Sequence, residues 1–72
     1  MPLTAGEKIK VLLGRRGMTI GQLAARLGVT GPNISNKIRR DDFGEKELRE
    51  IAKVLECTYE AVFVMTDSQE KI

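Results

Sequence analysis

The side chains best suited to specific contacts are concentrated in the middle of the chain. Between positions 33 and 40 lie two asparagines, a serine and three cations: Asn33, Ser35, Asn36, Lys37, Arg39 and Arg40. An asparagine amide can form two hydrogen bonds with the edge of adenine, and lysine and arginine side chains pair with phosphate. The combination predicts a surface that binds nucleic acid.

Groups that catalyse reactions or bind metals are scarce by comparison. The chain contains no histidine and a single cysteine, Cys57. No zinc-binding set, Cys–His pair or glycine-rich phosphate loop can be assembled from it. We therefore expect no enzyme activity, no cofactor and no metal, and we expect Cys57 to pack as a small apolar side chain. Asp41 and Asp42 are expected to be solvated in a loop.

Charge is divided unevenly along the chain, although the net value is only +2. Residues 1–40 contain eight basic side chains and one acidic one, whereas residues 41–72 contain four basic and nine acidic ones. A positive half attracts polyanions and a negative half is repelled by them. Charge alone does not distinguish DNA from RNA or an anionic membrane, but three aromatic residues offer little stacking surface for single strands.

The elements that must position these groups are predicted to be short helices. The signals for the first two are a pair of capping boxes and two terminal glycines: Thr4 with Glu7, Thr19 with Gln22, Gly17 and Gly28. Thr30 is placed to cap a third helix with Pro32 in its first turn, where a missing N–H costs little. This third helix is expected to end near Arg40.

Two further helices are expected in the second half of the chain. A helix from about 45 to 55 is predicted by four apolar residues at helical spacing: Leu48, Ile51, Ala52 and Leu55. A fifth, short helix is expected to follow Thr58. The apolar run 62–65 fits either a helix end or a strand, and we favour a short strand.

Residues 19–40 have the pattern of two short helices that cross at a steep angle through a three-residue turn. Ala24 is small where the second helix passes close to it, and Gly28 permits the positive φ that the turn requires. Four apolar side chains are expected to fill the wedge between the helices: Leu23, Leu27, Val29 and Ile34. The pattern predicts a helix-turn-helix motif.

The segment TIGQLAARLGVTGPNISNKI, residues 19–38, resembles the motif of the phage-repressor and Cro-like, or Xre-type, helix-turn-helix transcriptional regulators. The likeness extends from about residue 4 to residue 63, and Ser-Asn-Lys followed by a basic pair at the end of the third helix is similar to a smaller subgroup. The resemblance implies an all-α, compact five-helix domain of the lambda-repressor type over residues 1–72. We also expect a short C-terminal β-strand and a tail that comprises residues 64–72.

The resemblance also implies that the third helix enters the major groove of double-stranded DNA. Four of its residues are expected to read bases: Pro32, Asn33, Asn36 and Arg40. A second group is expected to bind phosphates: Gln22, Thr30, Ser35, Lys37, Arg39, Arg15 and Arg16. The sequence departs from the family pattern at Ile20, where relatives often have a phosphate-binding glutamine. It departs again at Gly31 and Pro32, which offer no side-chain hydrogen bond where relatives often read bases.

We expect a cytoplasmic, nucleoid-associated regulator of bacterial or phage type that acts as a repressor and has no small-molecule ligand. One such helix covers few base pairs, so we expect a homodimer on a pseudo-palindromic site. Its interface is expected to involve Tyr59, Val62, Val64 and Met65. The alternative is an interaction module of the same fold, such as an antitoxin-like protein that binds a partner protein. No apolar run reaches the ~20 residues of a membrane span, so no membrane association is expected.

Overall fold

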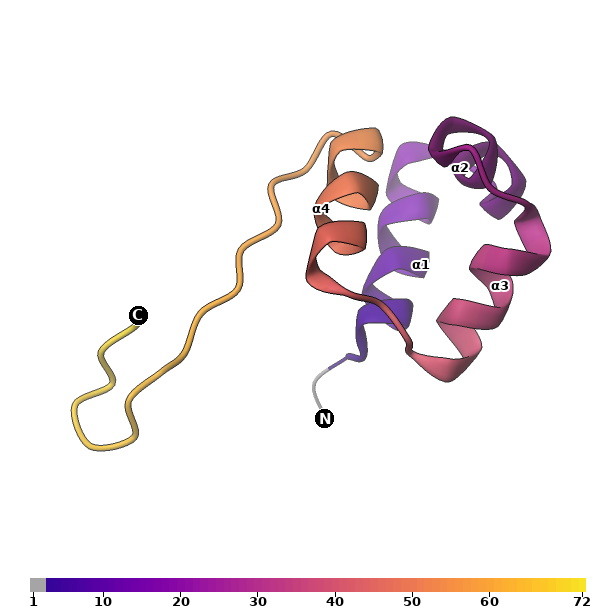
Figure 1. The fold of residues 1–72 in the computed structure, drawn as a ribbon. Coiled ribbons are helices and arrows are strands. Elements are labelled where there is room, and N and C mark those ends of the chain that lie inside the picture. Colours follow the sequence, from indigo (N-terminus) through magenta and orange to yellow (C-terminus); the bar gives the residue numbers. More distant parts are fainter. Residues whose placement is uncertain (1–2) are drawn as a thin grey trace.

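Four short helices and an extended C-terminal segment make up residues 3–72, which are the residues that the computed structural model describes (Figure 1). The helices are α1 (Ala5–Arg16), α2 (Ile20–Leu27), α3 (Gly31–Arg40) and α4 (Glu45–Val54). The predicted all-α class and the predicted positions of these helices are confirmed. Within residues 3–72, no helix has both the length and the apolar character that crossing a membrane requires.

Side chains cap the first three helices as the sequence predicts. At α1 the Thr4 hydroxyl accepts a hydrogen bond from the Glu7 N–H (3.2 Å), and the Glu7 carboxylate accepts one from the Thr4 N–H (2.9 Å). Contacts with Thr4, above all with its backbone N–H, hold the pKa of the Glu7 carboxyl below its ordinary value. Thr19 and Gln22 form the same reciprocal pair at α2, and the Thr30 hydroxyl caps α3. The starts of these helices are therefore set by local sequence.

All four helices in residues 3–72 end in a tight reversal that contains a residue of positive φ. Gly17 (φ 61°) ends α1 and Gly28 (φ 76°) ends α2, where glycine has no Cβ to clash with the following carbonyl. Asp41 (φ 53°) and Glu56 (φ 58°) take the same place after α3 and α4. In each case the next residue donates its N–H to the carbonyl five positions back, which satisfies one of the open carbonyls of the helix end.

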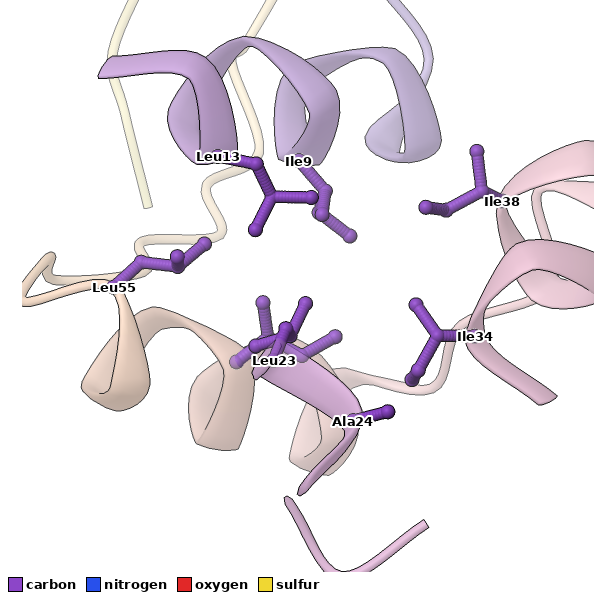
Figure 2. Close-up of a cluster of buried hydrophobic side chains, with 8 residues drawn as sticks. Ile9, Leu13, Leu23, Ala24, Ile34, Ile38 and Leu55 are labelled. Atoms are coloured by element: carbon purple, nitrogen blue, oxygen red, sulfur yellow. The ribbon is translucent and has the colours of Figure 1, made fainter. Parts of the chain in front are cut away.

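A small apolar core lies where the helices meet (Figure 2). Its fully buried large side chains come from α2, α3, α4 and the residue that follows α4: Leu23, Ile34, Ile51 and Leu55. Ile9 and Leu13 of α1 face the same cluster, and the small Ala24 lies between α2 and α3 (Figure 2). Val29, expected in the wedge between these two helices, is instead 40% exposed, because the reversal at Gly28 carries the chain away from the core.

The backbones of α1 and α3 approach each other closely at Gly6. A Cβ added there would lie 2.7 Å from the Ile38 carbonyl oxygen, so a larger residue would force the helices apart. Next to this contact, the Asp41 carboxylate accepts a hydrogen bond from the Gly6 N–H (3.1 Å) in the first turn of α1. The prediction that Asp41 is only a solvated loop residue is therefore wrong, since its side chain caps a neighbouring helix.

The predicted fifth helix is also wrong, because no helix follows α4 in the described part of the chain. The segment after Glu56 is extended, and residues 62–72 fold back on themselves with an isolated antiparallel bridge between Val64 and Lys71. Two hydrogen bonds join Phe63 and Ile72 (3.0 and 2.8 Å). The expected strand is thus present only as an extended, bridged segment. Pairing with residues 70–72 satisfies backbone groups that a helix would have satisfied internally.

The close approach at Gly6 is tested by a matched pair of substitutions in α1. Gly6→Ala is expected to lower the free energy of unfolding by about 1–3 kcal/mol, because the added methyl group must displace the backbone of α3. At Gly14 no atom lies within 4 Å of an added Cβ, so Gly14→Ala should raise stability by about 0.5–1 kcal/mol through helix propensity. Urea unfolding followed by circular dichroism measures both values. A stabilising Gly6→Ala would contradict the described packing.

Candidate nucleic-acid interface

The helix-turn-helix formed by α2 and α3 holds one side of α3 in the core and leaves the other side in solvent. Ile34 and Ile38, four residues apart, are the buried residues of α3. Apart from the half-buried Lys37, the polar residues around them and Pro32 are exposed: Pro32, Asn33, Ser35, Asn36, Arg39 and Arg40. Core contacts at helical spacing therefore determine which side chains face outward. The C-terminal tail lies on the opposite side of the helical body from α3 (Figure 1).

Asn36 and Arg39 contact each other on the outward side of α3. The Nη2 atom of Arg39 donates a hydrogen bond to Oδ1 of Asn36 (3.0 Å). This bond orients the Asn36 amide, whose nitrogen can donate to an external acceptor. Asn36, an expected base reader, and Arg39, an expected phosphate-binding residue, are therefore in direct contact.

Lys37 is placed differently from the other cations of α3. It is half-buried, and its ammonium group forms an ion pair with the Glu47 carboxylate of α4. The pair links α3 to α4. It also offsets the positive charge of Lys37, which the sequence predicts to bind a phosphate. A phosphate contact by Lys37 would have to compete with Glu47.

The first turns of α2 and α3 lie next to each other. A Cβ added at Gly31 would lie 3.9 Å from the Gly21 Cα. Helix N-termini carry open N–H groups and partial positive charge, so two adjacent ones favour the binding of phosphates. A shallow hollow beside them is lined by residues from α1, α2 and α3: Glu7, Lys10, Ile20, Ser35, Ile38 and Arg39.

Lys10 is a member of this hollow that the sequence analysis missed. It belongs to α1, outside the predicted motif, and only the packing of α1 across α3 brings it beside Ser35 and Arg39. In the sequence, Lys10 is a charged residue on the polar side of α1. Such a residue is more often simply solvated, so nothing in the sequence connects it with α3. Glu7 in the same hollow offsets part of the positive charge.

Two of the expected phosphate-binding residues have partners within the chain. The Arg16 guanidinium donates to the carbonyls of Leu55 (2.8 Å) and Glu56 (3.1 Å), so it closes the C-terminal end of α4. The side-chain oxygen of Gln22 accepts the capping hydrogen bond of α2 (2.9 Å), so only its amide nitrogen can act on a phosphate. Arg15, in contrast, is exposed in the last turn of α1.

The residues expected at a dimer interface divide into two kinds. Tyr59 is half-buried, with the Arg49 guanidinium 5.8 Å from the centre of its ring and Nη1 of Arg49 3.4 Å from its carbonyl oxygen. Val62, Val64 and Met65 are exposed in the tail. Three of the four residues therefore lie on open surface, whereas Tyr59 is engaged within its own chain.

In a comparison with protein families, residues 8–68 match the Cro/C1-type HTH DNA-binding domain. The match includes all of α2, α3 and α4 and most of α1. Neither the curated proteins nor the solved structures that were compared with the chain gave a match. Because the family match spans most of the 72 residues and coincides with the described helix-turn-helix, the chain belongs to the Cro/C1-type helix-turn-helix DNA-binding domain family.

Proposed function

We propose that this protein is a sequence-specific transcriptional regulator, acting as a repressor, that inserts α3 into the major groove of double-stranded DNA. The observation that carries the proposal is the exposed side of α3, which is rich in asparagine and arginine and is held in place by Ile34 and Ile38. An α-helix fits the major groove, where every base pair presents a distinct pattern of donors and acceptors.

Base reading is assigned first to Asn36, whose amide is already oriented by Arg39. Asn33 and Arg40 extend the same exposed side toward the two ends of α3, and Pro32 offers apolar contact to a thymine methyl group. With no side-chain hydrogen bond from Gly31 or Pro32, one copy of α3 reads few bases. Specificity from a single α3 is therefore modest.

Phosphate binding is assigned to the rim of the helix-turn-helix. Residues with an exposed donor in or beside it are the following: Gln22, Thr30, Ser35, Arg39 and, from the structure, Lys10. Arg15, exposed in the last turn of α1, is assigned to phosphate with them. Arg16 is assigned to the end of α4 instead, because both of its hydrogen bonds are to backbone carbonyls. Lys37 contributes only when its pair with Glu47 opens.

A homodimer follows from the small footprint of α3. Two copies related by a two-fold axis would read half-sites separated by a whole number of helical turns, about 34 Å each. The exposed apolar tail is the observation that favours a protein partner, and a second copy of this chain fits the symmetry of a pseudo-palindromic site.

Asn36→Ala is expected to reduce discrimination between the preferred site and a scrambled duplex by about 1–3 kcal/mol, because the amide contact with a base is lost. The preferred site is first selected from a random duplex library, and both affinities are then measured by fluorescence anisotropy. Thr58→Ala, an exposed polar position beyond α4, is the control. Unchanged discrimination in Asn36→Ala would remove Asn36 from the readers.

Arg39→Ala is expected to weaken binding to every duplex and to reduce the slope of log K against log salt by about 0.9, the value for one phosphate contact. A smaller loss of discrimination should accompany it, because the Asn36 amide loses the hydrogen bond that orients it. Lys53→Ala removes the same charge from the last turn of α4 and should leave the slope unchanged. A purely sequence-dependent loss would assign Arg39 to bases. No binding of the unmodified chain to any duplex at low salt would contradict the proposed function and favour the partner-binding alternative.

Glu47→Gln is expected to strengthen binding to every duplex, because loss of the carboxylate releases Lys37 for a phosphate. The salt slope should become steeper by about 0.9. Glu50→Gln removes the same charge from an exposed position of the same helix and should have the smaller effect. If both variants change affinity and slope equally, the Lys37–Glu47 pair does not restrain binding.

A further inference from the structure

A hollow with a volume of about 180 Å³ lies between α1 and α4. Two stripes of apolar side chains form its walls: Ala5, Ile9 and Leu12 of α1, and Leu48, Ile51 and Ala52 of α4. Residues 57–59 border it as well, whereas no residue of α2 or α3 does. The hollow is therefore separate from the candidate nucleic-acid interface.

The sizes of the side chains explain why there is space between these two helices. Ala5 and Ala52 contribute only a methyl group each, one on either wall. Ile9 and Ile51, which are 3% and 2% exposed, form the floor above the core. Interiors of proteins contain few voids larger than a water molecule, so a hollow of this volume beside so small a core is an unusual feature.

The C-terminal tail does not cover the hollow. Tyr59 is the last residue along the chain that lines it, and the tail then runs away from α1 and α4 (Figure 1). The hydrogen bonds of residues 62–72 join residues of that segment to one another. Because the predicted fifth helix is absent, no further element of residues 3–72 packs over the two stripes.

Lys8 is the one charged residue that lines the hollow within residues 3–72. It is exposed, lies one turn before Leu12, and forms no ion pair with any of the described residues. The Cys57 thiol donates to the Leu55 carbonyl oxygen (3.3 Å), so Cys57 lines the wall as a small apolar side chain. The hollow thus combines an apolar floor with one positive charge at its rim.

We propose that the hollow binds a small monoanionic ligand, in which an apolar ring or short hydrocarbon chain carries one carboxylate. The apolar part lies on Ile9 and Ile51, and the carboxylate pairs with Lys8. The volume suits such a ligand, because an apolar cavity of about 150 Å³ in another protein binds benzene. This inference goes beyond the proposed function. It also differs from the sequence-based expectation of no small-molecule ligand, because the two walls meet only in the folded chain.

A small molecule fits the hollow better than a partner protein or a nucleic acid does. A helix that binds in a groove inserts several side chains from two or more turns, whereas a volume of about 180 Å³ accommodates a single ring. A nucleic acid would bring several phosphates to a surface that offers one cation. One ring with one carboxylate matches both the volume and the charge.

The first test uses three probe ligands that differ from one another in a single property. Phenylacetate has the ring and the charge, phenylacetamide keeps the ring without the charge, and acetate keeps the charge without the ring. Phenylacetate is expected to bind with a Kd of about 1 mM or lower. Phenylacetamide should bind about fivefold more weakly, through loss of one exposed ion pair, and acetate at least about tenfold more weakly. Titrations followed by ¹H–¹⁵N NMR give the affinities, with the largest shifts expected in α1, α4 and residues 57–59.

Variants then place the probe in the hollow. Lys8→Gln should weaken phenylacetate about fivefold and leave phenylacetamide unchanged. Lys46→Gln removes the same charge from an exposed position of α4 outside the hollow and should change neither affinity. Ala5→Leu, at a half-buried position where a larger side chain displaces little of the core, should weaken both ring-bearing probes at least about tenfold. Ala52→Val narrows the facing wall as a second filling variant, and circular dichroism verifies that the helices are retained.

Three results would overturn the inference. They are the absence of saturable shifts with phenylacetate, equal affinity for phenylacetate and phenylacetamide, and binding that neither Ala5→Leu nor Ala52→Val weakens. Phe63→Ser tests the tail as a rival occupant, because Phe63 is the most exposed apolar side chain of the tail (83%). Tighter binding of phenylacetate to this variant would assign the hollow to the tail instead of a ligand. All measurements are made without DNA, so their failure leaves the proposed function standing.

Discussion

The packing of Ile34 and Ile38 against α1 and α2 is the interaction on which the rest of this structure depends. The helices have only 8 to 12 residues, and isolated helices of this length are marginal in water. Each therefore persists because it contributes a few side chains to one shared core. Since the buried side of α3 is fixed by these two isoleucines, the same packing that stabilises the fold also aims Asn36 and Arg39 at solvent.

Hydrogen bonds between helix ends supplement this core. Asp41 caps the start of α1, Arg16 closes the end of α4, and Lys37 pairs with Glu47 across α3 and α4. A hydrogen bond of this kind typically contributes about 0.5–1.5 kcal/mol and a part-exposed ion pair about 1 kcal/mol or less, amounts that matter in so small a domain. Disulfides or zinc stabilise many other small proteins. In this chain, with one cysteine and no histidine, these contacts supply part of that stabilisation.

The distribution of charge and the arrangement of the helices both favour the binding of a polyanion on one side of the molecule. Basic side chains of α1 and α3, among them Lys10 and Arg39, border the exposed face of the helix-turn-helix, while α4 and the residues after it hold seven of the ten acidic side chains. A polyanion is drawn to one side of the molecule and repelled from the other. The Lys37–Glu47 pair lies where these two regions meet, so it lowers the charge at the edge of the candidate interface without reducing it at the centre.

The sequence by itself determined the four helices, their caps and the outward side of α3, because periodicity, capping boxes and glycine stops act over a few residues. It did not determine how the ends of distant elements meet. The cap that Asp41 provides for Gly6, the engagement of Arg16 at Leu55 and the approach of Lys10 to Ser35 depend on how whole helices cross. The tail was undecided for the same reason. Four apolar residues are compatible with helix or strand, and only the return of residues 70–72 alongside them supplied the backbone partners that select the extended form.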